Sequence, residues 1–393
     1  MTVSRWLLLS STLALAAGVV TDAPALTGTT SRPQLTSSEA ASQTVARHLA
    51  QAGPIGALVT DNWDPSAGVA LLKADYAVAA DGSTRYRTVQ AAVDAAVAAG
   101  GSMRRYISMA PGTYTEVVCV PAAAPPLTLF GLGGSPASTT IRFGNANPTP
   151  KPTGSATHPC ASNAASSTIG TSDSGTVTVR AAQFQARNLA IVNSYVEGTY
   201  SGSNQSAVAL ALRGDKAVLE NVVLTGNQDT LLVSAGSANT VIRAYLKGGT
   251  IEGDTDFIFG SGVAVFAGST IRYTAARRGA TDGGVIFAPS TRPGSSYGFL
   301  AIGSTFDAVG TPGSGTVWLG RAWDESVGSL ANYVDGTSPN GKVVIRDSVL
   351  GGHIRKSAPW NASTIGRPYC SSSCSTSANR FYEYANSGAG SAP

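Results

Sequence analysis

One short pattern recurs six times from residue 188 onward and constrains the fold more than any other feature. Each copy has a Gly, Asn or Asp, then two residues, then an aliphatic or aromatic residue. The copies are Asn188…Ile191, Asn221…Leu224, Gly248…Ile251, Gly268…Ile271, Gly303…Phe306 and Asp347…Leu350. Their spacings of 33, 27, 20, 35 and 44 residues are too irregular for a strict solenoid, but they fit coils with loops of different length at the corners. The pattern predicts an all-β parallel β-helix, and a β-sandwich is the alternative.

The composition narrows the class of protein. Charged residues make up only 13% of the 393, and there are 45 glycines. This argues against a disordered chain, which needs high charge, and against a helical bundle. The net charge of +4 is compatible with a polyanionic partner. No long run of Lys and Arg occurs, so we expect no nucleic-acid partner.

The N-terminus has the features of an export signal. Arg5 precedes an apolar run over residues 6–20, and the sequence A-P-A at 23–25 offers a cleavage site. We therefore expect a signal peptide over residues 1–25, and a secreted or periplasmic protein that has no membrane attachment once the signal is removed. We also expect the mature protein to be a monomer.

The remainder divides by pattern into a polar stretch and one large domain. Residues 26–75 are weakly patterned and are expected to form a linker or cap, with a short helix over 38–52. Residues 76–393 are expected to form the β-helix domain. Within it, residues 88–99 (TVQAAVDAAVAA) predict an amphipathic helix that ends at two glycines and caps one end of the core. Residues 145–170, rich in Ala, Pro, Ser, Thr and Asn, predict an inserted loop.

Four cysteines in an exported chain indicate disulfides. They allow three pairings, and we favour Cys119–Cys160 with Cys370–Cys374, because only three serines separate the second pair. A zinc site is the competing interpretation, since His158 lies near Cys160. The spacing provides no second close cysteine pair, so we expect no metal.

Two aspartates occupy the same position in successive copies of the pattern. Asp229 and Asp256 each follow their anchor, Leu224 or Ile251, by five residues. Neighbouring coils of a β-helix lie about 4.8 Å apart, so this register would stack the two carboxylates. Gln228 directly precedes Asp229. Gln205 lies 24 residues before Asp229, near one coil length.

Stacked carboxylates suit acid/base or nucleophilic chemistry. Like charges at this range raise one pKa and leave the other group ionised. An arginine such as Arg321, near Trp323, would orient the ionised group. Each residue also has an ordinary structural interpretation: a solvated turn for the aspartates, a loop amide for Gln205, a surface charge for Arg321 and a core aromatic ring for Trp323.

At these residues the chain resembles the pectin methylesterases, the pectinesterase family of carbohydrate esterases. The resemblance rests on residues 226–231 (GNQDTL), 256–260 (DFIFG) and 319–323 (LGRAW), in the family's order. Residues 111–116 resemble its G-x-Y-x-E segment and residues 205–210 (QSAVAL) its Q-A-V-A-L segment. It spans roughly residues 76–391. It implies a right-handed, single-stranded parallel β-helix that hydrolyses the methyl esters of pectin without a cofactor.

The resemblance also implies a role for each residue of the site. Asp256 matches the nucleophile, and Asp229 matches the proton donor that later activates water. Gln205 and Gln228 match the donors to the oxyanion, and Arg321 matches the residue that orients the nucleophile. Trp323, Phe259 and Thr171 match substrate-contacting positions.

Two departures and three rival functions accompany this interpretation. The stretch between the two aspartates is longer than usual, around residues 234–239, and Ala322 stands where Pro is common. These leave the catalytic set intact and put the detailed subsites in question. The rivals are an acyl-thioester or other esterase on the same scaffold, a glycosidase that uses the paired aspartates, and a non-catalytic polysaccharide-binding β-helix.

Overall fold

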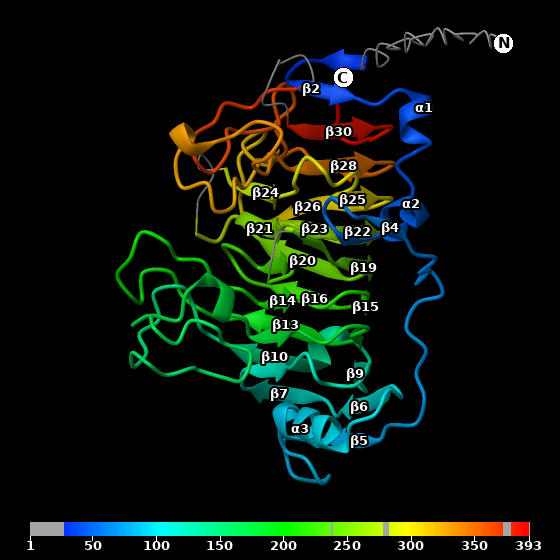
Figure 1. Ribbon diagram of the computed structural model, residues 1–393, viewed down its shortest axis with the longest axis vertical. Coiled ribbons are helices and arrows are strands. Elements are labelled where there is room, and N and C mark those ends of the chain that lie inside the picture. Colours follow the sequence, from blue (N-terminus) through cyan, green and yellow to red (C-terminus); the bar gives the residue numbers. More distant parts are fainter. Residues whose placement is uncertain (1–26, 237–238, 278–282, 372–378, 393) are drawn as a thin grey trace, which may run out of the picture.

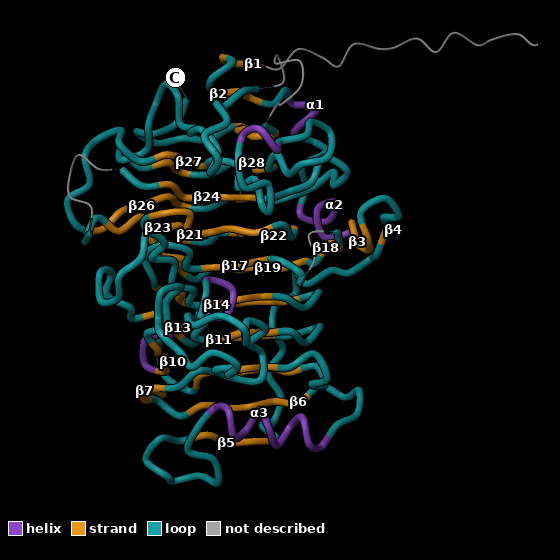
Figure 2. Tube along the Cα trace, turned by 60° about the vertical axis from the view of Figure 1, so that its left-hand side comes forward, coloured by secondary structure: helices purple, strands orange, loops and turns teal. Residues whose placement is uncertain are grey.

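The computed structural model describes residues 27–236, 239–277, 283–371 and 379–392. They form three long sheets stacked along one axis, with strands running as rungs across it (Figures 1 and 2). Successive strands of the chain enter the three sheets in a fixed cyclic order, and every pairing within the stack from β5 to β30 is parallel. This arrangement is a parallel β-helix, as predicted, and the β-sandwich alternative is wrong.

The first sheet has twelve strands and receives both ends of the chain. In sheet order these are β1 (Thr27–Thr29), β2 (Arg32–Gln34), β30 (Arg380–Tyr384), β28 (Lys342–Arg346), β25 (Phe299–Ile302), β22 (Val263–Ala267), β19 (Arg243–Lys247), β15 (Ala217–Glu220), β12 (Gln185–Arg187), β9 (Leu127–Gly131), β6 (Arg105–Met109) and β5 (Tyr76–Val78).

The second and third sheets complete each coil. The eight-stranded sheet contains β29 (Val349–Leu350), β26 (Thr305–Val309), β23 (Thr270–Thr274), β20 (Thr250–Gly253), β16 (Val223–Thr225), β13 (Ala190–Asn193), β10 (Thr139–Phe143) and β7 (Gly112–Thr115). The seven-stranded sheet contains β27 (Trp318–Gly320), β24 (Val285–Pro289), β21 (Thr255–Gly260), β17 (Leu231–Val233), β14 (Leu210–Leu212), β11 (Val177–Val179) and β8 (Val118–Val120).

The six copies of the sequence pattern mark one corner and one column of this stack. Their aliphatic or aromatic anchors are Cα partners from each coil to the next, in the eight-stranded sheet. Their first residues all have a left-handed backbone, with φ between 51° and 62°. Gly, Asn and Asp adopt this conformation most readily, which explains why only these residue types start the pattern. The column also includes Ile141 and Tyr114, which the pattern did not reveal.

The interior of the stack is apolar. Buried aliphatic and aromatic side chains from all three sheets form one continuous core. Phe266, Phe287 and Phe299 lie in it with ring centroids about 6 Å apart, at 5.9, 6.2 and 6.1 Å for the three pairs. Such contacts between coils hold the rungs in register and give the sheets a rigid outer face.

In the part of the chain that the structure describes, three α-helices and three short 3-10 helices lie outside the sheets. They are α1 (Ser37–Ala40), α2 (Val45–Ala50), α3 (Val89–Ala99), η1 (Pro136–Ser138), η2 (Thr171–Asp173) and η3 (Leu330–Asn332). Helix α3 has Thr88 as its N-cap and lies beside β5 at one end of the stack (Figure 1). The Glu116 carboxylate accepts hydrogen bonds from the main-chain N–H groups of Val89 and Gln90, so the G-x-Y-x-E segment fixes the start of this helix.

Residues 27–75 run along the outside of the stack from its C-terminal end to its N-terminal end (Figure 1). Leu35, Leu49 and Val69 pack against outward-facing residues of the twelve-stranded sheet. The single helix expected over 38–52 is wrong: α1 ends at Ala40, and from Gln51 the chain forms β3 (Gln51–Pro54). This strand pairs antiparallel with β4 (Val59–Thr60) and β18 (Thr240–Val241).

The loops carry the remaining sequence predictions. Residues 145–170 contain no helix or strand, as expected for an insertion, and a disulfide joins Cys119 in β8 to Cys160 in this loop. The disulfide engages the two thiols that lie beside His158. Cys374 of the predicted Cys370–Cys374 pair and the predicted signal peptide lie outside the described residues. No helix among the described residues is long and apolar enough to span a membrane.

Candidate active site

Asp229 and Asp256 lie in neighbouring coils, just before or at the start of β17 and β21. Their anchors Leu224 and Ile251 are Cα partners. The main-chain N–H of Asp229 donates to the carbonyl of Thr255, the residue before Asp256, at 3.0 Å. The stacking predicted from the matched offset is confirmed.

Both aspartates have a left-handed backbone, with φ of 68° for Asp229 and 49° for Asp256. A glycine stands three residues before each, and neither glycine has room for a side chain. A Cβ at Gly226 would lie 2.7 Å from Thr230 Oγ1, and one at Gly253 would lie 2.3 Å from the Cβ of Phe257. The repeated G-x-x-D spacing is therefore a second sign of equivalence between the two coils, and it could have been read from the sequence.

Arg321 holds Asp256 through two hydrogen bonds. Its Nε donates to Oδ1 at 2.9 Å and its Nη2 donates to Oδ2 at 2.6 Å. Arg321 follows β27, two coils beyond β21 in the same sheet, so the ladder itself brings the guanidinium over the carboxylate. A bidentate pair of this kind fixes the plane of the carboxylate and places a full positive charge against it.

Asp229 has no arginine of its own. Burial raises its pKa well above the ordinary value, the negative charge of Asp256 raises the pKa further, and a hydrogen bond with Ser206 opposes the rise only in part. The two stacked carboxyl groups thus differ in environment: one is paired with a cation, and the other is buried without one. This difference favours a proton on Asp229.

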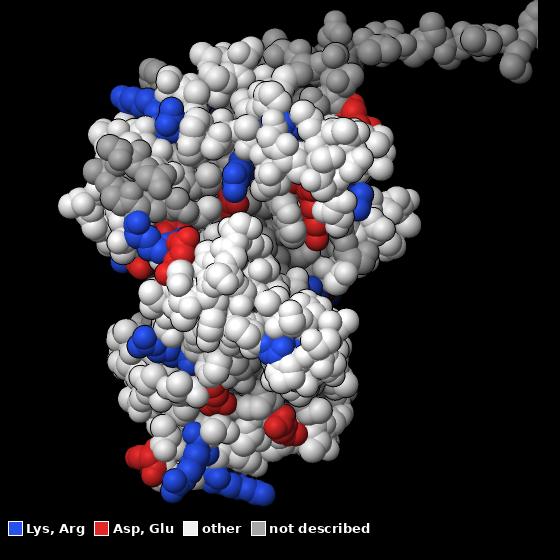
Figure 3. Space-filling model, turned by 90° about the vertical axis from the view of Figure 1, so that its left-hand side faces the viewer, with Lys and Arg blue, Asp and Glu red and all other residues white. Residues whose placement is uncertain are grey.

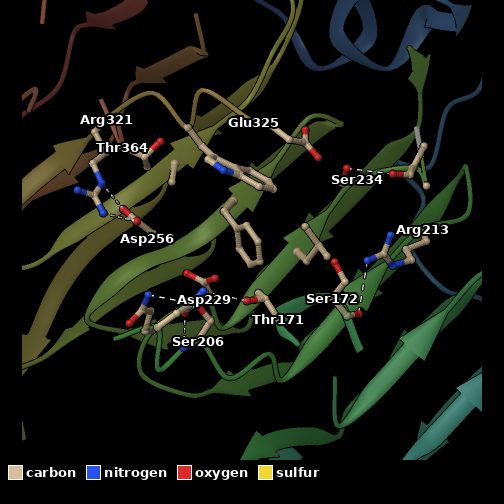
Figure 4. Close-up of a pocket in the computed structure, with 18 residues that line it drawn as sticks. Thr171, Ser172, Ser206, Arg213, Asp229, Ser234, Asp256, Arg321, Glu325 and Thr364 are labelled. Carbon is tan, nitrogen blue, oxygen red and sulfur yellow. Dashed lines mark hydrogen bonds and ion pairs between the residues drawn. The ribbon is translucent and has the colours of Figure 1, made fainter. Parts of the chain in front are cut away.

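A cavity of about 380 Å³ contains both aspartates. Figure 4 shows Asp256 with Arg321 on one side, Asp229 with Ser206 on another, and Arg213 at the far side. The residues that line it are Thr171, Ser172, Asn204, Ser206, Arg213, Gln228, Asp229, Leu232, Ser234, Ala235, Gly236, Asp256, Phe259, Ala288, Arg321, Trp323, Glu325 and Thr364.

The predicted pair of glutamines is only half present in this cavity. Gln228 lines it, and its Nε2 donates to Ser206 Oγ at 3.2 Å. Gln205 does not line it. Its Nε2 donates to the carbonyls of Tyr200 and Gly202, at 3.2 and 2.7 Å, so both of its N–H groups are already used. The expectation that Gln205 donates to a substrate is therefore not supported, because the side chain serves to fold its own loop.

Ser206 occupies the place predicted for Gln205. It lines the cavity, and its hydroxyl donates to Asn204 Oδ1 and accepts from Gln228. The sequence held a signal for this, since Ser206 and not Gln205 directly precedes the A-V-A-L segment that begins at Ala207. One inserted residue relative to Q-A-V-A-L shifts the amide away from the site.

The predicted aromatic and threonine positions do line the cavity. Phe259 and Trp323 have ring centroids 5.6 Å apart. They belong to an apolar patch on the outer face of the seven-stranded sheet that includes Leu232 and Ala288. Thr171, at the start of η2, accepts hydrogen bonds from Asn147 and Asn204. The remaining polar lining, Arg213, Glu325 and Thr364 among it, was not anticipated from the sequence.

Loops from distant parts of the chain frame the cavity. The inserted loop and residues 194–207 project from one side of the stack, as do residues 321–341 from a later coil (Figure 1). Figure 3 views this side of the molecule and shows charged side chains that are few and scattered. The charges concentrated in the cavity are therefore unusual for this surface.

Comparison with known families identifies a family of enzymes. The sequence profile described as Pectinesterase matches residues 75–331. The chain belongs to the pectinesterase family. As a pectinesterase, the protein is a carboxylic ester hydrolase.

The pectinesterase relatives cover nearly the whole chain. It is 58% identical over 393 residues to the Pectinesterase of Ralstonia nicotianae, covering 99% of each chain. The solved structure of rice weevil pectin methyl esterase matches with a TM-score of 0.79 and 37% identity, covering 93% of this chain and 99% of that one. Escherichia coli YbhC matches with a TM-score of 0.78 and 30% identity, covering 92% and 96%.

Proposed function

We propose that the protein hydrolyses the methyl esters of polygalacturonate, the acidic polymer of pectin, to free carboxylates and methanol. The single observation that carries this assignment is the asymmetric carboxyl pair. Asp256, held by Arg321, lies in one cavity beside the buried Asp229, which has no cation of its own. One group is suited to attack a carbonyl and the other to deliver a proton.

In the first step an oxygen of Asp256 attacks the carbonyl carbon of the methyl ester. The bond from that carbon to the methoxy oxygen then breaks, and Asp229 gives its proton to the departing oxygen, which leaves as methanol. The products are an anhydride between Asp256 and the uronate, and an ionised Asp229. The raised pKa of Asp229 keeps a proton available for this step.

In the second step Asp229 accepts a proton from water. The water oxygen adds to the uronate carbonyl carbon, and the bond to Asp256 breaks. The sugar carboxylic acid leaves and ionises in solvent, while Asp256 returns as a carboxylate and Asp229 as an acid. Arg321 stabilises the returning charge on Asp256 throughout.

Gln228 is the proposed donor to the tetrahedral oxyanion. Its Nε2 has one N–H toward Ser206, and the second is available to a ligand. We assign Ser206, in place of Gln205, to the same hydrogen-bonded group, because it contacts Gln228 and adjoins Asp229. Phe259 and Trp323 are the proposed stacking surface for the sugar rings.

The finer predictions on architecture and location form part of this proposal. We propose a right-handed winding, with α3 as the cap of the N-terminal end, supported by its position beside β5 and its buried face of Val89, Ala92, Val93 and Ala96. We also propose that residues 1–25 are a signal peptide and that the mature protein, residues 26–75 and the β-helix domain 76–393, acts as a secreted or periplasmic monomer. Its partner is the polysaccharide, without nucleic acid, membrane or cofactor.

The decisive experiment compares three reactions of the purified protein. Methanol release from methylated pectin is the expected activity. Hydrolysis of an acyl thioester without methanol release would instead support the esterase rival, for which E. coli YbhC, a relative whose name provisionally assigns acyl-CoA thioester hydrolysis, is the precedent. New reducing ends would indicate a glycosidase, and pectin binding without any product would indicate a binding protein.

A further inference from the structure

Two arginines follow neighbouring strands of the seven-stranded sheet. Val179 of β11 and Leu212 of β14 are Cα partners, and Arg180 and Arg213 are the next residues. The main-chain N–H of Arg213 donates to the carbonyl of Val179 at 2.8 Å. The ladder therefore stacks the two guanidinium-bearing residues one coil apart, as it stacks the two aspartates at the opposite ends of the strands.

The arginines border a depression that adjoins the catalytic cavity. This second cavity has a volume of about 490 Å³ and is lined by Ala122, Ser162, Ser172, Arg180, Arg213 and Gly236. Ser172, Arg213 and Gly236 also line the catalytic cavity, so the two are continuous. Figure 4 shows Arg213 across the cavity from Asp256.

Little of the hydrogen-bonding capacity of the two arginines is used. Arg180 Nη2 donates to the carbonyl of Cys160 at 2.6 Å, and Arg213 Nη2 reaches the carbonyl of Ser172 only at 3.4 Å. A guanidinium has five N–H donors. The Nε of each arginine is buried without a partner, and no carboxylate of the described residues lies within ion-pair distance of either.

The nearest acidic groups are engaged elsewhere. Asp173 accepts hydrogen bonds from the main-chain N–H groups of Ser162 and Asn163, at 2.8 Å each. Glu325 accepts one from Ser290 at 2.9 Å. Burial, followed by the positive charge of Arg180, lowers the pKa of Arg213, and the negative charges of Asp173 and Glu325 offset this only in part. An anion between the two arginines would relieve the repulsion that remains.

The position of the arginines fixes which part of a polymer could reach them. Asp229 lies two residues before Leu231, whose partner Leu210 lies three residues before Arg213. Five residues of strand span about 16 Å. An anion bound by the arginines therefore belongs to a different sugar unit from the one whose ester reacts at Asp256.

We propose that Arg180 and Arg213 form a carboxylate subsite that binds a free C6 carboxylate of the same polygalacturonate chain. This inference rests on the proposed function and deepens it. The enzyme would prefer esters that lie a few units from an already de-esterified galacturonate, so its own product would direct the next round. A methylated galacturonate carries no charge at C6, so the two guanidinium groups would bind it much more weakly than a free carboxylate.

The test measures methanol release from fully methylated and half-methylated pectin at equal methyl-ester concentration. For the wild type we expect a lower KM on the half-methylated substrate. In Arg213→Gln and Arg180→Gln/Arg213→Gln that KM should rise about tenfold or more, and it should rise more than the KM on fully methylated pectin, so that the preference of the wild type is lost. High salt should remove the difference. Arg85→Gln, the same charge loss at an exposed position, is the matched control.

A binding measurement keeps the inference independent of catalysis. Unesterified hexagalacturonate should bind the double variant about tenfold or more weakly than wild type by calorimetry, while Arg180→Lys/Arg213→Lys retains part of the affinity and shows that loss of folding is not the cause. Equal affinities, or equal KM ratios in wild type and variants, would overturn the subsite. A protein that releases no methanol from either pectin would overturn the proposed activity, and the hexagalacturonate affinities would still decide the role of the arginines.

Discussion

Asp254 and Asp256 lie two residues apart at the start of β21, and each forms an ion pair with an arginine. Comparing the surroundings of the two pairs shows why only one of them belongs to the candidate active site. Arg277 donates to both carboxylate oxygens of Asp254, at 2.5 and 2.6 Å, just as Arg321 does to Asp256. Asp254 is fully buried, and Arg277 also contacts Glu197. The geometry of the two ion pairs is alike, and only the surroundings differ.

Access to the cavity and the presence of a second carboxyl group distinguish the two pairs. Asp256 lines the cavity, and its charge acts on Asp229 in the next coil. Asp254 does not line the cavity, so its pair stabilises the fold without meeting a substrate. A charge pair thus becomes reactive when one side is open and a neighbouring acid is left uncompensated.

The strongest test of the difference between the two pairs is to remove the Asp256 carboxylate. Asp256→Ala should lower kcat for methanol release by roughly 10⁴-fold or more, because the proposed nucleophile is lost. Unfolding in urea should change less than in the matching variant of Asp254, since the Arg321 side chain remains 27% exposed and can be solvated. Activity that survives this substitution contradicts the mechanism.

Removing Asp254 should have the converse effect. Among the described residues, Asp254→Ala leaves Arg277 paired with Glu197, and breaking a buried ion pair costs about 3–5 kcal/mol. We expect a lower free energy of unfolding by urea with a kcat for the folded protein within about tenfold of wild type. A kcat loss comparable to that of Asp256→Ala would show that the two pairs are not separable.

The glutamines provide a matched pair of the same residue type. Gln228→Ala should lower kcat by roughly 10²–10³-fold, the usual cost of losing an oxyanion donor. Gln205→Ala should change kcat far less and act through the loop that its amide holds. Equal losses of kcat in the two variants would indicate that Gln205 also takes part in catalysis. Little loss of kcat in Gln228→Ala would favour the glycosidase rival.

The smallest expected effect concerns the pH dependence of stability. The pKa of Asp229 is raised in the folded protein, so its contribution to stability is complete below the ordinary value of 3.8 and is lost as the pH rises through the folded-state pKa. Asp229→Asn removes this loss. The Tm of the variant minus that of wild type should therefore grow with pH. A constant difference would mean that Asp229 is not held as an acid.

Several features of the fold were accessible from the sequence because they depend on local chemistry. The corners of the coils need a residue with a left-handed backbone conformation. Asn188, Gly248 and the other first residues of the pattern therefore reveal the repeat despite its irregular spacing. The stacking of Asp229 on Asp256 followed from equal offsets within that repeat. The disulfide Cys119–Cys160 belongs to the favoured one of three possible pairings, and the structure confirms it.

Other features depended on contacts between residues far apart in the chain. Residues 27–75 follow the outer face of the twelve-stranded sheet without a local sequence pattern. An apolar residue every few positions is enough to pack this segment against the flat face of the sheet. The misplacement of Gln205 came from a single inserted residue, and in a strand or its flanking turn a shift of one residue sends a side chain to another side. The offset of Gln205 from the A-V-A-L segment signals the shift, and the hydrogen bonds of its amide show where the side chain lies.

The sequence by itself determined that two carboxylates share a column, because the repeat sets the register and the register sets the stack. The tertiary structure alone decided that Asp229 is buried without a cation of its own, that the amide of Gln205 is used within its own loop, and that Arg180 and Arg213 lie together at the far ends of the strands. The reason is physical. Register is carried by the local period of one chain, whereas the charge, burial and hydrogen bonding of a side chain depend on residues that other coils and their loops bring to it.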